Sequence, residues 1–556
     1  MVSEKSEELK ARAISGQQAA LDYYDWINAN EETVQSRKPA LRREVLRSAQ
    51  TFSRLARAAE RRMCVGVYGQ SQSGKSFLIS SLASKKPGAL QVRFDTESKD
   101  FLKEINPTGG KESTGVVTRF QLKANSLPNP DFPVEIRLMS EFDLVRVFGN
   151  AYHSDLDSSL RRRLTAEELD DHLSIVEAQC SPVQSDKTFE LEDYFQEHFP
   201  RRDFSYFETL KPFWSRLSSI IETGSVSTRS QAYAVLWGCE EIFSEALERL
   251  LKILEALGQP ETAYCKTEIF ETSSVMEVGT VVKKFGAGTG TTTQILTPSG
   301  TKVTADHAEL AVLISELVVV LEEKPYEFFE HTDLLDFPGA RSRKEMAALN
   351  KSSMGDLIVR GKVAFLFQRY AAERELTTML LCVDDGPQEV PSLGPQIANW
   401  IKTTHGSTPE ERAGAAVSMF LVLTKVDIHF DKAPDTGRLD EVWTNRLHSS
   451  LENHLIIEDD EQGNKRDRSW LGNWAQGECF LNSYWLRNPT IESATFEKKG
   501  KGDDTKETGV NPRFKERLEH LRKGFVDNEE AAKYFRNPQD AWEAALKLDD
   551  GGISYI

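Results

Sequence analysis

A glycine-rich segment at residues 69–76 has the residue types and the spacing that bind the phosphate groups of a nucleotide. It reads Gly69-Gln70-Ser71-Gln72-Ser73-Gly74-Lys75-Ser76 and matches the pattern G-x-x-x-x-G-K-[ST] at every fixed position. In such a loop, backbone N–H groups surround the phosphates, the lysine reaches the β- and γ-phosphates, and the final hydroxyl ligates Mg²⁺. We therefore expect residues 69–76 and Phe77 to bind phosphate, with Lys75 also catalytic and Ser76 a metal ligand.

The residues on either side of this segment support that interpretation. An apolar run at 63–68 precedes it and is typical of a buried strand, and an apolar helix is expected directly after it. A chance Gly-Lys-Ser in a surface turn is the alternative, but it would not require a strand before it and a helix after it.

A second segment, Asp333-Leu-Leu-Asp336-Phe-Pro-Gly339, could complete a magnesium site. An apolar strand would deliver Asp336 to the metal through a water molecule, and the N–H of Gly339 could contact the γ-phosphate. The alternative is a strand followed by an ordinary Pro-Gly turn. Asp333 lies three residues earlier, and we expect it only to cap the beginning of the strand.

A third segment indicates which base is bound. Residues 421–427 form an apolar strand that ends in Thr424-Lys425-Val-Asp427. A carboxylate at Asp427 can accept hydrogen bonds from N1–H and the exocyclic amine of guanine, while the Lys425 stem covers the base. Adenine lacks this pair of donors, so an unpaired buried carboxylate would disfavour it. We expect a guanine site that also includes Asn482 and Ser483, which follow a strand expected at 479–481.

A threonine is also expected between the phosphate loop and the Asp336 strand, where its hydroxyl could reach Mg²⁺. Residues 107–120 are the one suitable segment, because glycines and threonines precede a short apolar run there. We favour Thr118 as the ligand and keep Thr114 as the alternative.

The segments at 107–120, 333–339 and 421–427, together with the phosphate loop, resemble those of a dynamin-type large GTPase. The resemblance rests on Gly-x-Val-Thr-Arg at 115–119, D-x-P-G at 336–339 and T-K-x-D at 424–427. More closely, residues 105–120, NPQDAW at 537–542 and DDGGISY at 549–555 resemble the putative bacterial virulence factor family of SrfC type. The resemblance implies a bacterial protein that is cytoplasmic or a delivered effector, and that hydrolyses GTP to GDP and phosphate with Mg²⁺.

The sequence departs from the dynamin pattern at the expected catalytic residues. Dynamins usually carry Gln-Ser at the third and fourth loop positions, whereas Ser71 and Gln72 stand here in reversed order. No glutamine directly follows the Asp336–Gly339 turn. With Lys75 and Thr118, Ser71 and Gln72 form the expected catalytic set. We expect slow turnover unless a homodimer across the nucleotide, or a partner, completes the site. Arg341 and Arg343 are the nearest arginines that a dimer could use.

The alternation of strand-like and helix-length segments predicts an α/β fold with a mostly parallel sheet and flanking helices. We expect a dynamin-like P-loop GTPase domain in two pieces, 63–140 and 326–495. N-terminal helices (1–62) and C-terminal helices (510–556) would form a bundle. A mainly helical insertion (141–325) would carry a small β element at 266–304, then a helix at 305–323. The charged stretches 458–468 and 497–509 are expected to be loops.

Composition excludes several classes of function. Asp and Glu (86) outnumber Lys and Arg (69), giving a net charge of −17, which argues against a nucleic-acid binder. Six scattered cysteines without a C-x-x-C pattern favour free thiols, and the histidines show no zinc spacing. No apolar run is long enough to span a bilayer, and the N-terminus has no signal peptide.

Other signals have simpler explanations. Residues 37–62 carry a net charge of +7 and could form a membrane-surface helix, although a bundle helix is favoured. Gly286–Gly290 is expected to be a hairpin tip, Asp384-Asp385-Gly386 a turn after a strand, and Trp470 and Trp474 packing anchors. A GTP-controlled switch or scaffold that binds an operon or effector partner remains the alternative function, and an ATPase is disfavoured by Asp427.

Overall fold

The computed structural model describes residues 4–85, 89–106, 115–123, 125–183, 185–271, 274–340, 346–384, 386, 393–431, 439–452, 455, 470–500 and 505–556. All structural statements below concern these residues. Thr114, Arg341, Arg343, Asp385 and the charged stretch 458–468, each singled out from the sequence, lie outside them.

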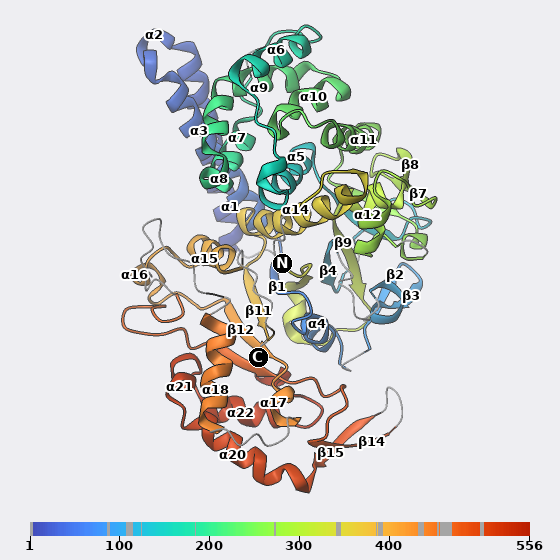
Figure 1. The fold of residues 1–556 in the computed structure, drawn as a ribbon, viewed down its shortest axis with the longest axis vertical. Coiled ribbons are helices and arrows are strands. Elements are labelled where there is room, and N and C mark those ends of the chain that lie inside the picture. Colours follow the sequence, from blue (N-terminus) through green and yellow to red (C-terminus); the bar gives the residue numbers. More distant parts are fainter. Residues whose placement is uncertain are drawn as a thin grey trace.

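Within the described residues, thirteen strands form one mixed sheet at the centre of the molecule (Figure 1). Their main order is β13-β12-β11-β1-β10-β4-β9-β5-β6-β7-β8, and β3 pairs with β2, which pairs with β9. The strands are β1 Met63–Gly69, β2 Gln91–Phe94, β3 Glu97–Asp100, β4 Val117–Gln121, β5 Val134–Leu138, β6 Thr262–Cys265, β7 Thr292–Leu296, β8 Lys302–Asp306, β9 Ile314–Leu321, β10 Thr332–Asp336, β11 Thr378–Val383, β12 Met419–Thr424 and β13 Ser483–Leu486.

Helices surround the sheet and fill the long connections between its strands (Figure 1). They are α1 Glu4–Ala29, α2 Glu31–Val34, α3 Lys38–Glu60, α4 Lys75–Ala83, α5 Glu141–Asn150, α6 Ala166–Glu177, α7 Phe189–His198, α8 Pro200–Leu210, α9 Trp214–Thr223, α10 Val226–Tyr233, α11 Glu241–Leu257, α12 Val278–Lys284, α13 His307–Leu313, α14 Lys351–Ala372, α15 Leu393–Thr404, α16 Pro409–Arg412, α17 Asp427–Asp431, α18 Leu439–Leu447, α20 Lys515–Val526, α21 Glu529–Tyr534 and α22 Pro538–Leu546. Several begin at the capping boxes expected of such sequences, for example Thr165 with Glu168.

The half of the sheet around β1 is parallel. β1 pairs in parallel with β10 on one side and β11 on the other, and β12 and β13 continue in the same direction. Their apolar residues are buried, as is typical of parallel strands covered on both faces. After β1 the chain builds the strands on the β10 side of the sheet, and after β10 it crosses to build β11, β12 and β13 on the other side of β1. The carboxyl end of β1 is therefore a topological switch point, where open α/β sheets bind ligands.

The expectation of one helix over 305–323 was wrong in its second half. α13 ends at Leu313, and the next residues form β9, which lies between β4 and β5 in the sheet. The continuous apolar run fits a buried helix or a buried strand equally well, and only tertiary pairing decides. As a result, the β strands of the 141–325 segment extend the main sheet instead of forming a separate small element.

The glycine cluster at 286–290 is also placed differently from the expectation. The β-branched run before it, which suggested a strand, folds as α12, with Val278 and Val281 buried. Gly286, Gly288 and Gly290 therefore join a helix to β7. The tip of the β7–β8 hairpin lies at 297–301 instead, where Gly300 has a φ of 91°.

The N-terminal helices do not bundle with the C-terminal helices, contrary to the expectation. Figure 1 shows α1–α3 at one end of the molecule and α20–α22 at the other. The arginines of α3 and Arg61, which follows it, form ion pairs with acidic residues of the 141–325 segment and with residues that follow α14: Arg42 with Asp186, Arg43 with Glu192, Arg47 with Asp193, Arg54 and Arg57 with Glu373, and Arg61 with Glu375. The positive charge that suggested a membrane-surface helix is therefore largely paired with acidic side chains of the protein itself.

The C-terminal helices pack beside β13 around buried aromatic rings. Trp443 of α18 lies 5.4 Å from Trp485 of β13 and 5.6 Å from Trp542 of α22 between ring centroids. Residues 497–509 were expected to be a loop, but their described part forms a hairpin of β14 (Phe496–Lys499) and β15 (Lys506–Val510). Trp470 and Trp474 are buried against Phe480, as expected of packing anchors.

Two further expectations can be compared with the structure. All six cysteines are free, and Cys64, Cys265 and Cys382 are buried. A search of the helices in the described ranges finds none with the length and apolarity needed to cross a lipid bilayer.

Candidate functional site

The glycine-rich segment forms a tight loop between β1 and α4. Gly69 has a φ of 149°, and a Cβ there would lie 2.2 Å from the carbonyl oxygen of Cys382. Gly74 precedes α4 with a φ of 83°, so both positions require glycine. The Ser73 hydroxyl donates to the Gln70 carbonyl at 2.8 Å, which closes the loop on itself. The loop thus has the strand-loop-helix context predicted from the sequence.

Lys75 is buried at the start of α4 and points back into this loop. Its Nζ donates to the carbonyl oxygens of Gln70 at 2.5 Å and Gly69 at 3.3 Å. Burial raises the pKa of Asp336, at the end of the neighbouring β10, to about 7, and the positive charge of Lys75 opposes the rise. A cation and a carboxyl group therefore lie near each other beneath the loop, where anionic phosphate and a divalent metal could both be held.

The residues after β10 clamp the loop from the other side. Ala340 N–H donates to Gly69 at 3.0 Å, and Ser71 N–H donates to the Ala340 carbonyl at 3.2 Å. A Cβ on Gly339 would lie 2.8 Å from Ser71 Cα and 3.0 Å from Lys75 Nζ. The Pro-Gly turn is therefore in direct contact with the phosphate loop, and glycine is required there by close approach of the backbone.

Thr118 lies in β4 directly opposite Asp336 in the antiparallel pairing of β4 with β10. The two side chains consequently point to the same face of the sheet. Thr118 is fully buried, and its hydroxyl oxygen has no hydrogen-bond partner among the described residues. A buried hydroxyl without a partner costs free energy, so this position favours a ligand that the protein itself does not supply.

The segment proposed to read the base reaches the same edge of the sheet from β12. The Thr424 hydroxyl donates to the Ser73 carbonyl at 2.7 Å, which joins this segment to the phosphate loop. Lys425 has a φ of 59°, and its Nζ lies 2.6 Å from Asp384 Oδ2. Asp427 begins α17, and partial burial raises the pKa of its carboxyl group.

The structure does not bring Asn482 and Ser483 to this site, and their assignment is corrected. The strand expected at 479–481 begins later, so Ser483 opens β13 and pairs with Leu421, while Leu486 pairs with Thr424. The Asn482 amide donates to the Met419 carbonyl at the far end of β12. A shift of a few residues in the strand therefore moved both side chains away from the nucleotide edge.

Three other residues at this edge of the sheet were not assigned to the site from the sequence. Asn488 follows β13 and donates its N–H to Asp427 Oδ1 at 3.5 Å. Asp384, which was interpreted only as a turn residue, accepts from Lys425. Arg446 of α18 is buried and donates to the Thr424 carbonyl at 2.8 Å. The positions of Asn488 and Asp384 after parallel strands could have revealed two of them, but nothing local marks Arg446.

The remaining predicted residues lie around the loop. Ser76 is exposed at the first turn of α4 and Phe77 is half-buried beside it. Ser71 is half-buried, and Gln72 is exposed at the loop tip with a φ of 60°. In the described part of the chain, no three His, Cys, Asp or Glu side chains are grouped to hold a metal.

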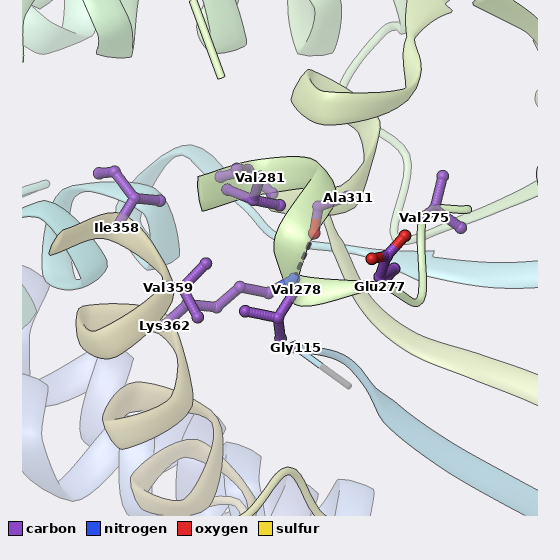
Figure 2. A pocket seen from close by; sticks show the side chains of 10 residues that line it. Gly115, Val275, Glu277, Val278, Val281, Ala311, Ile358, Val359 and Lys362 are labelled. Atoms are coloured by element: carbon purple, nitrogen blue, oxygen red, sulfur yellow. Dashed lines mark hydrogen bonds between the residues drawn. The ribbon is translucent and has the colours of Figure 1, made fainter. Parts of the chain in front are cut away.

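A small cavity lies near the start of β4, beside this site (Figure 2). Its volume is about 10 Å³, and Gly115, Val278, Val281, Val359 and Lys362 are among its lining residues. That volume is about one water molecule, so it cannot hold a nucleotide. Lys362 extends from α14 into it and donates to the carbonyl oxygens of Ala311 and Ile314, each at 2.6 Å.

In a comparison with known protein families, one family model matches nearly the whole chain. A family model described as putative bacterial virulence factor matches residues 20–556, which include the sheet, the 141–325 segment and the C-terminal helices. A search of curated proteins finds no match.

Proposed function

The chain belongs to the putative bacterial virulence factor family, and we propose that it is a Mg²⁺-dependent enzyme that hydrolyses GTP to GDP and phosphate. The observation that carries this proposal is the convergence of three segments far apart in sequence. Gly339 and Thr424 each contact the phosphate loop, at the carboxyl ends of β1, β10 and β12. A chance match to one motif would not bring the other two against it.

The topology supports a P-loop GTPase fold of the dynamin-like type. The loop follows β1 at the switch point, where α/β sheets bind ligands, and α4 begins directly behind it. The N-terminus of that helix favours a bound phosphate through its free N–H groups and its dipole. The positive charge of Lys75 adds to the same preference.

Guanine is favoured over adenine by the carboxyl group of Asp427. It is half-buried beside the Asn488 N–H, and Lys425 is held nearby by Asp384. A carboxylate at this position can accept from two donors of guanine, whereas adenine would leave it unpaired. A P-loop ATPase is the less favoured alternative for that reason.

The residues present fit a magnesium ion. Thr118 and Ser76 offer hydroxyls and Asp336 offers a carboxyl group. The Thr118 hydroxyl is buried and has no hydrogen-bond partner among the residues that the structure describes. Bound Mg²⁺ would neutralise charge on the β- and γ-phosphates. Lys75 and the loop N–H groups would bind the phosphates, and the Gly339 N–H would approach the γ-phosphate. Ser71, Gln72 and Thr118 would orient the attacking water and bind the charge that develops.

Turnover is proposed to depend on association. No glutamine directly follows the Asp336–Gly339 turn, and Ser71 and Gln72 are reversed relative to dynamins. A homodimer across the nucleotide could supply the missing charge, and an added arginine can raise such rates by about 10³–10⁵. The same features favour a second function: a GTP-controlled switch or scaffold with little hydrolysis, which presents a surface to an effector or operon partner in virulence.

Calorimetric titration with GDP, GTP and ATP tests the proposal. Lys75→Ala should abolish phosphate binding, whereas Lys402→Ala, on the exposed side of α15, should bind as the wild type does. Asp427→Asn should weaken GDP and admit xanthosine diphosphate, because the amide reverses the hydrogen-bond polarity. Equal binding of GDP by wild type and folded Lys75→Ala would overturn the proposal, and equal competition by ATP would overturn the choice of guanine.

A further inference from the structure

Arg119 directly follows Thr118 in β4, and its side chain lies on the opposite face of the sheet. It is 5 % exposed, so its charge must be balanced by protein groups. The site residues described above do not include it, and it lies on the far side of the strand from the expected nucleotide. Its contacts therefore need a separate explanation.

Three acidic side chains surround the guanidinium group of Arg119. Its Nε and Nη2 donate to the two oxygens of Glu316 in β9, at 2.8 and 3.0 Å. Its Nη1 donates to Asp333 in β10 at 3.2 Å, and Nη2 also donates to Glu375 after α14 at 2.9 Å. Asp333 was expected only to cap a strand, and it instead holds Arg119. One side chain thus ties β4 to both neighbouring strands.

A second layer of arginines holds these carboxylates. Arg62 Nε lies 2.8 Å from Asp333, and Arg61 Nη1 lies 2.6 Å from Glu375, both just after α3. Arg137 of β5 lies 3.2 Å from Glu316. Burial raises the pKa of Glu316, but Arg119 and Arg137 outweigh it and lower that pKa to about 2. Glu316 is therefore ionised at neutral pH, and each of the three carboxylates has at least two arginine partners.

The cluster fixes the register of β4. A slip of one residue would turn Thr118 to the other face and place Arg119 on the face of Asp336. The guanidinium would then be buried without its three carboxylates, which is strongly unfavourable. The pairing of Thr118 with Asp336 is consequently the one that leaves Arg119 satisfied.

We infer that Arg119 is a positioning residue for the proposed GTP hydrolysis, which acts by holding the Thr118 hydroxyl opposite Asp336. This role rests on the proposed function. Arg119 touches neither nucleotide nor metal in this assignment. It should therefore influence the Mg²⁺-dependent chemical step more than the binding of GDP, because the phosphate loop and the base segment are built from other strands.

Arg119→Lys tests this role in the full-length protein, since lysine keeps the charge but cannot reach three carboxylates with a planar fork. We expect kcat for GTP to fall at least tenfold and the Mg²⁺ concentration for half-maximal rate to rise. The Kd for GDP should stay within about twofold of wild type. Hydrogen exchange should quicken in β4 and stay unchanged in β12.

A milder double variant covers the case in which Arg119→Lys does not fold. Arg61→Gln with Arg62→Gln removes two of the three outer arginines, and it should shift kcat and Mg²⁺ dependence in the same direction by about two- to fivefold. Arg54→Gln with Arg57→Gln, in the preceding turns of α3 and paired with Glu373, is the matched control and should match wild type.

The outcomes separate this inference from the proposed function. A wild type that neither binds nor hydrolyses GTP overturns the proposed function and this role with it. An active wild type with unchanged kcat and Mg²⁺ dependence in Arg119→Lys overturns the role alone. An equal loss of GDP affinity and kcat would also overturn it, because that pattern indicates general loosening of the fold.

Discussion

Replacement of Lys362 by methionine tests how the start of β4 is held. Lys362 is 2 % exposed, and its Nζ donates to the carbonyl oxygen of Ala311 in the last turn of α13 (Figure 2). It also donates to the carbonyl oxygen of Ile314 at the start of β9. Methionine has a similar length and cannot donate. The change therefore leaves two carbonyl groups without this donor, in a site lined by valines and next to Gly115.

The expected loss of stability in Lys362→Met can be estimated from the two carbonyl groups that lose their hydrogen-bond donor. An unsatisfied buried polar group costs about 1–3 kcal/mol, so Lys362→Met should lower the free energy of unfolding by about 2–6 kcal/mol at a pH where the lysine is neutral in both the folded and the unfolded chain. A neutral amine still carries two N–H groups, one for each carbonyl. The loss should be concentrated where α12, α13 and α14 meet.

The effect should depend on pH in a defined direction. Burial lowers the pKa of Lys362 from 10.5 to about 7. Between those values the unfolded chain holds a proton that the folded chain does not, so this residue contributes more stability as pH rises, by up to about 1.4 kcal/mol per unit. Below about pH 7 the charge must be buried, and that contribution is lost. The stability gap between wild type and Lys362→Met should therefore widen with pH.

Urea unfolding at about pH 7.5, 8.5 and 9.5, followed by fluorescence and circular dichroism, measures the gap. Lys402→Met, on the exposed side of α15, is the control and should run parallel to wild type at each pH. Hydrogen exchange should locate the loss in α13 and β9. A constant gap between wild type and Lys362→Met across this range would refute the reasoning, because the lysine would then not titrate there.

Three other predictions concern the nucleotide site. Gly339→Ala should weaken GDP binding about ten- to hundredfold in calorimetry, since its Cβ would meet Ser71 Cα at 2.8 Å. Gly472→Ala is the control and should bind as wild type does, because a Cβ there would meet no atom of the described residues within 4 Å. Thr118→Val should leave the melting temperature unchanged or higher, because it removes a buried unpaired hydroxyl, yet slow hydrolysis at least tenfold; a melting temperature lowered as by a core truncation would contradict this. Specific activity should rise with protein concentration, and a transition-state mimic should convert monomer to dimer in sedimentation. Constant specific activity over an about hundredfold range of protein concentration, with a monomer throughout, would favour the GTP-controlled switch instead.

The parts of the site that could be predicted from the sequence are those specified by short local patterns. An apolar strand followed by a polar or glycine-rich turn marks each of Gly69, Asp336 and Thr424. The carboxyl ends of parallel strands share one edge, so their proximity follows once the strands are recognised. The contacts of Ser71 with Ala340 and of Ser73 with Thr424 agree with this expectation.

The parts that could not be predicted depend on contacts between distant segments. The apolar run after Leu313 gives no periodicity that separates a helix from a strand, so the place of β9 in the sheet was not foreseen. β13 begins only at Ser483, and a strand boundary carries an error of about 2–4 residues from sequence, enough to misplace Asn482. The partners of the α3 arginines lie up to hundreds of residues away and leave no local signal.

Residues 314–321, which were expected to form part of a helix, instead form β9 and connect the 141–325 segment to the main sheet. Since β9 pairs with β4 on one side and β5 on the other, the 141–325 segment shares the sheet with the phosphate loop. Thr118 therefore sits in a strand held between Asp336 on β10 and Glu316 on β9. Any displacement of that strand must be accommodated by the 141–325 segment as well. For this reason Lys362→Met and Arg119→Lys, which disturb different supports of one strand, should be coupled when combined. Strict additivity of their effects on stability would mean that β4 does not transmit strain between them.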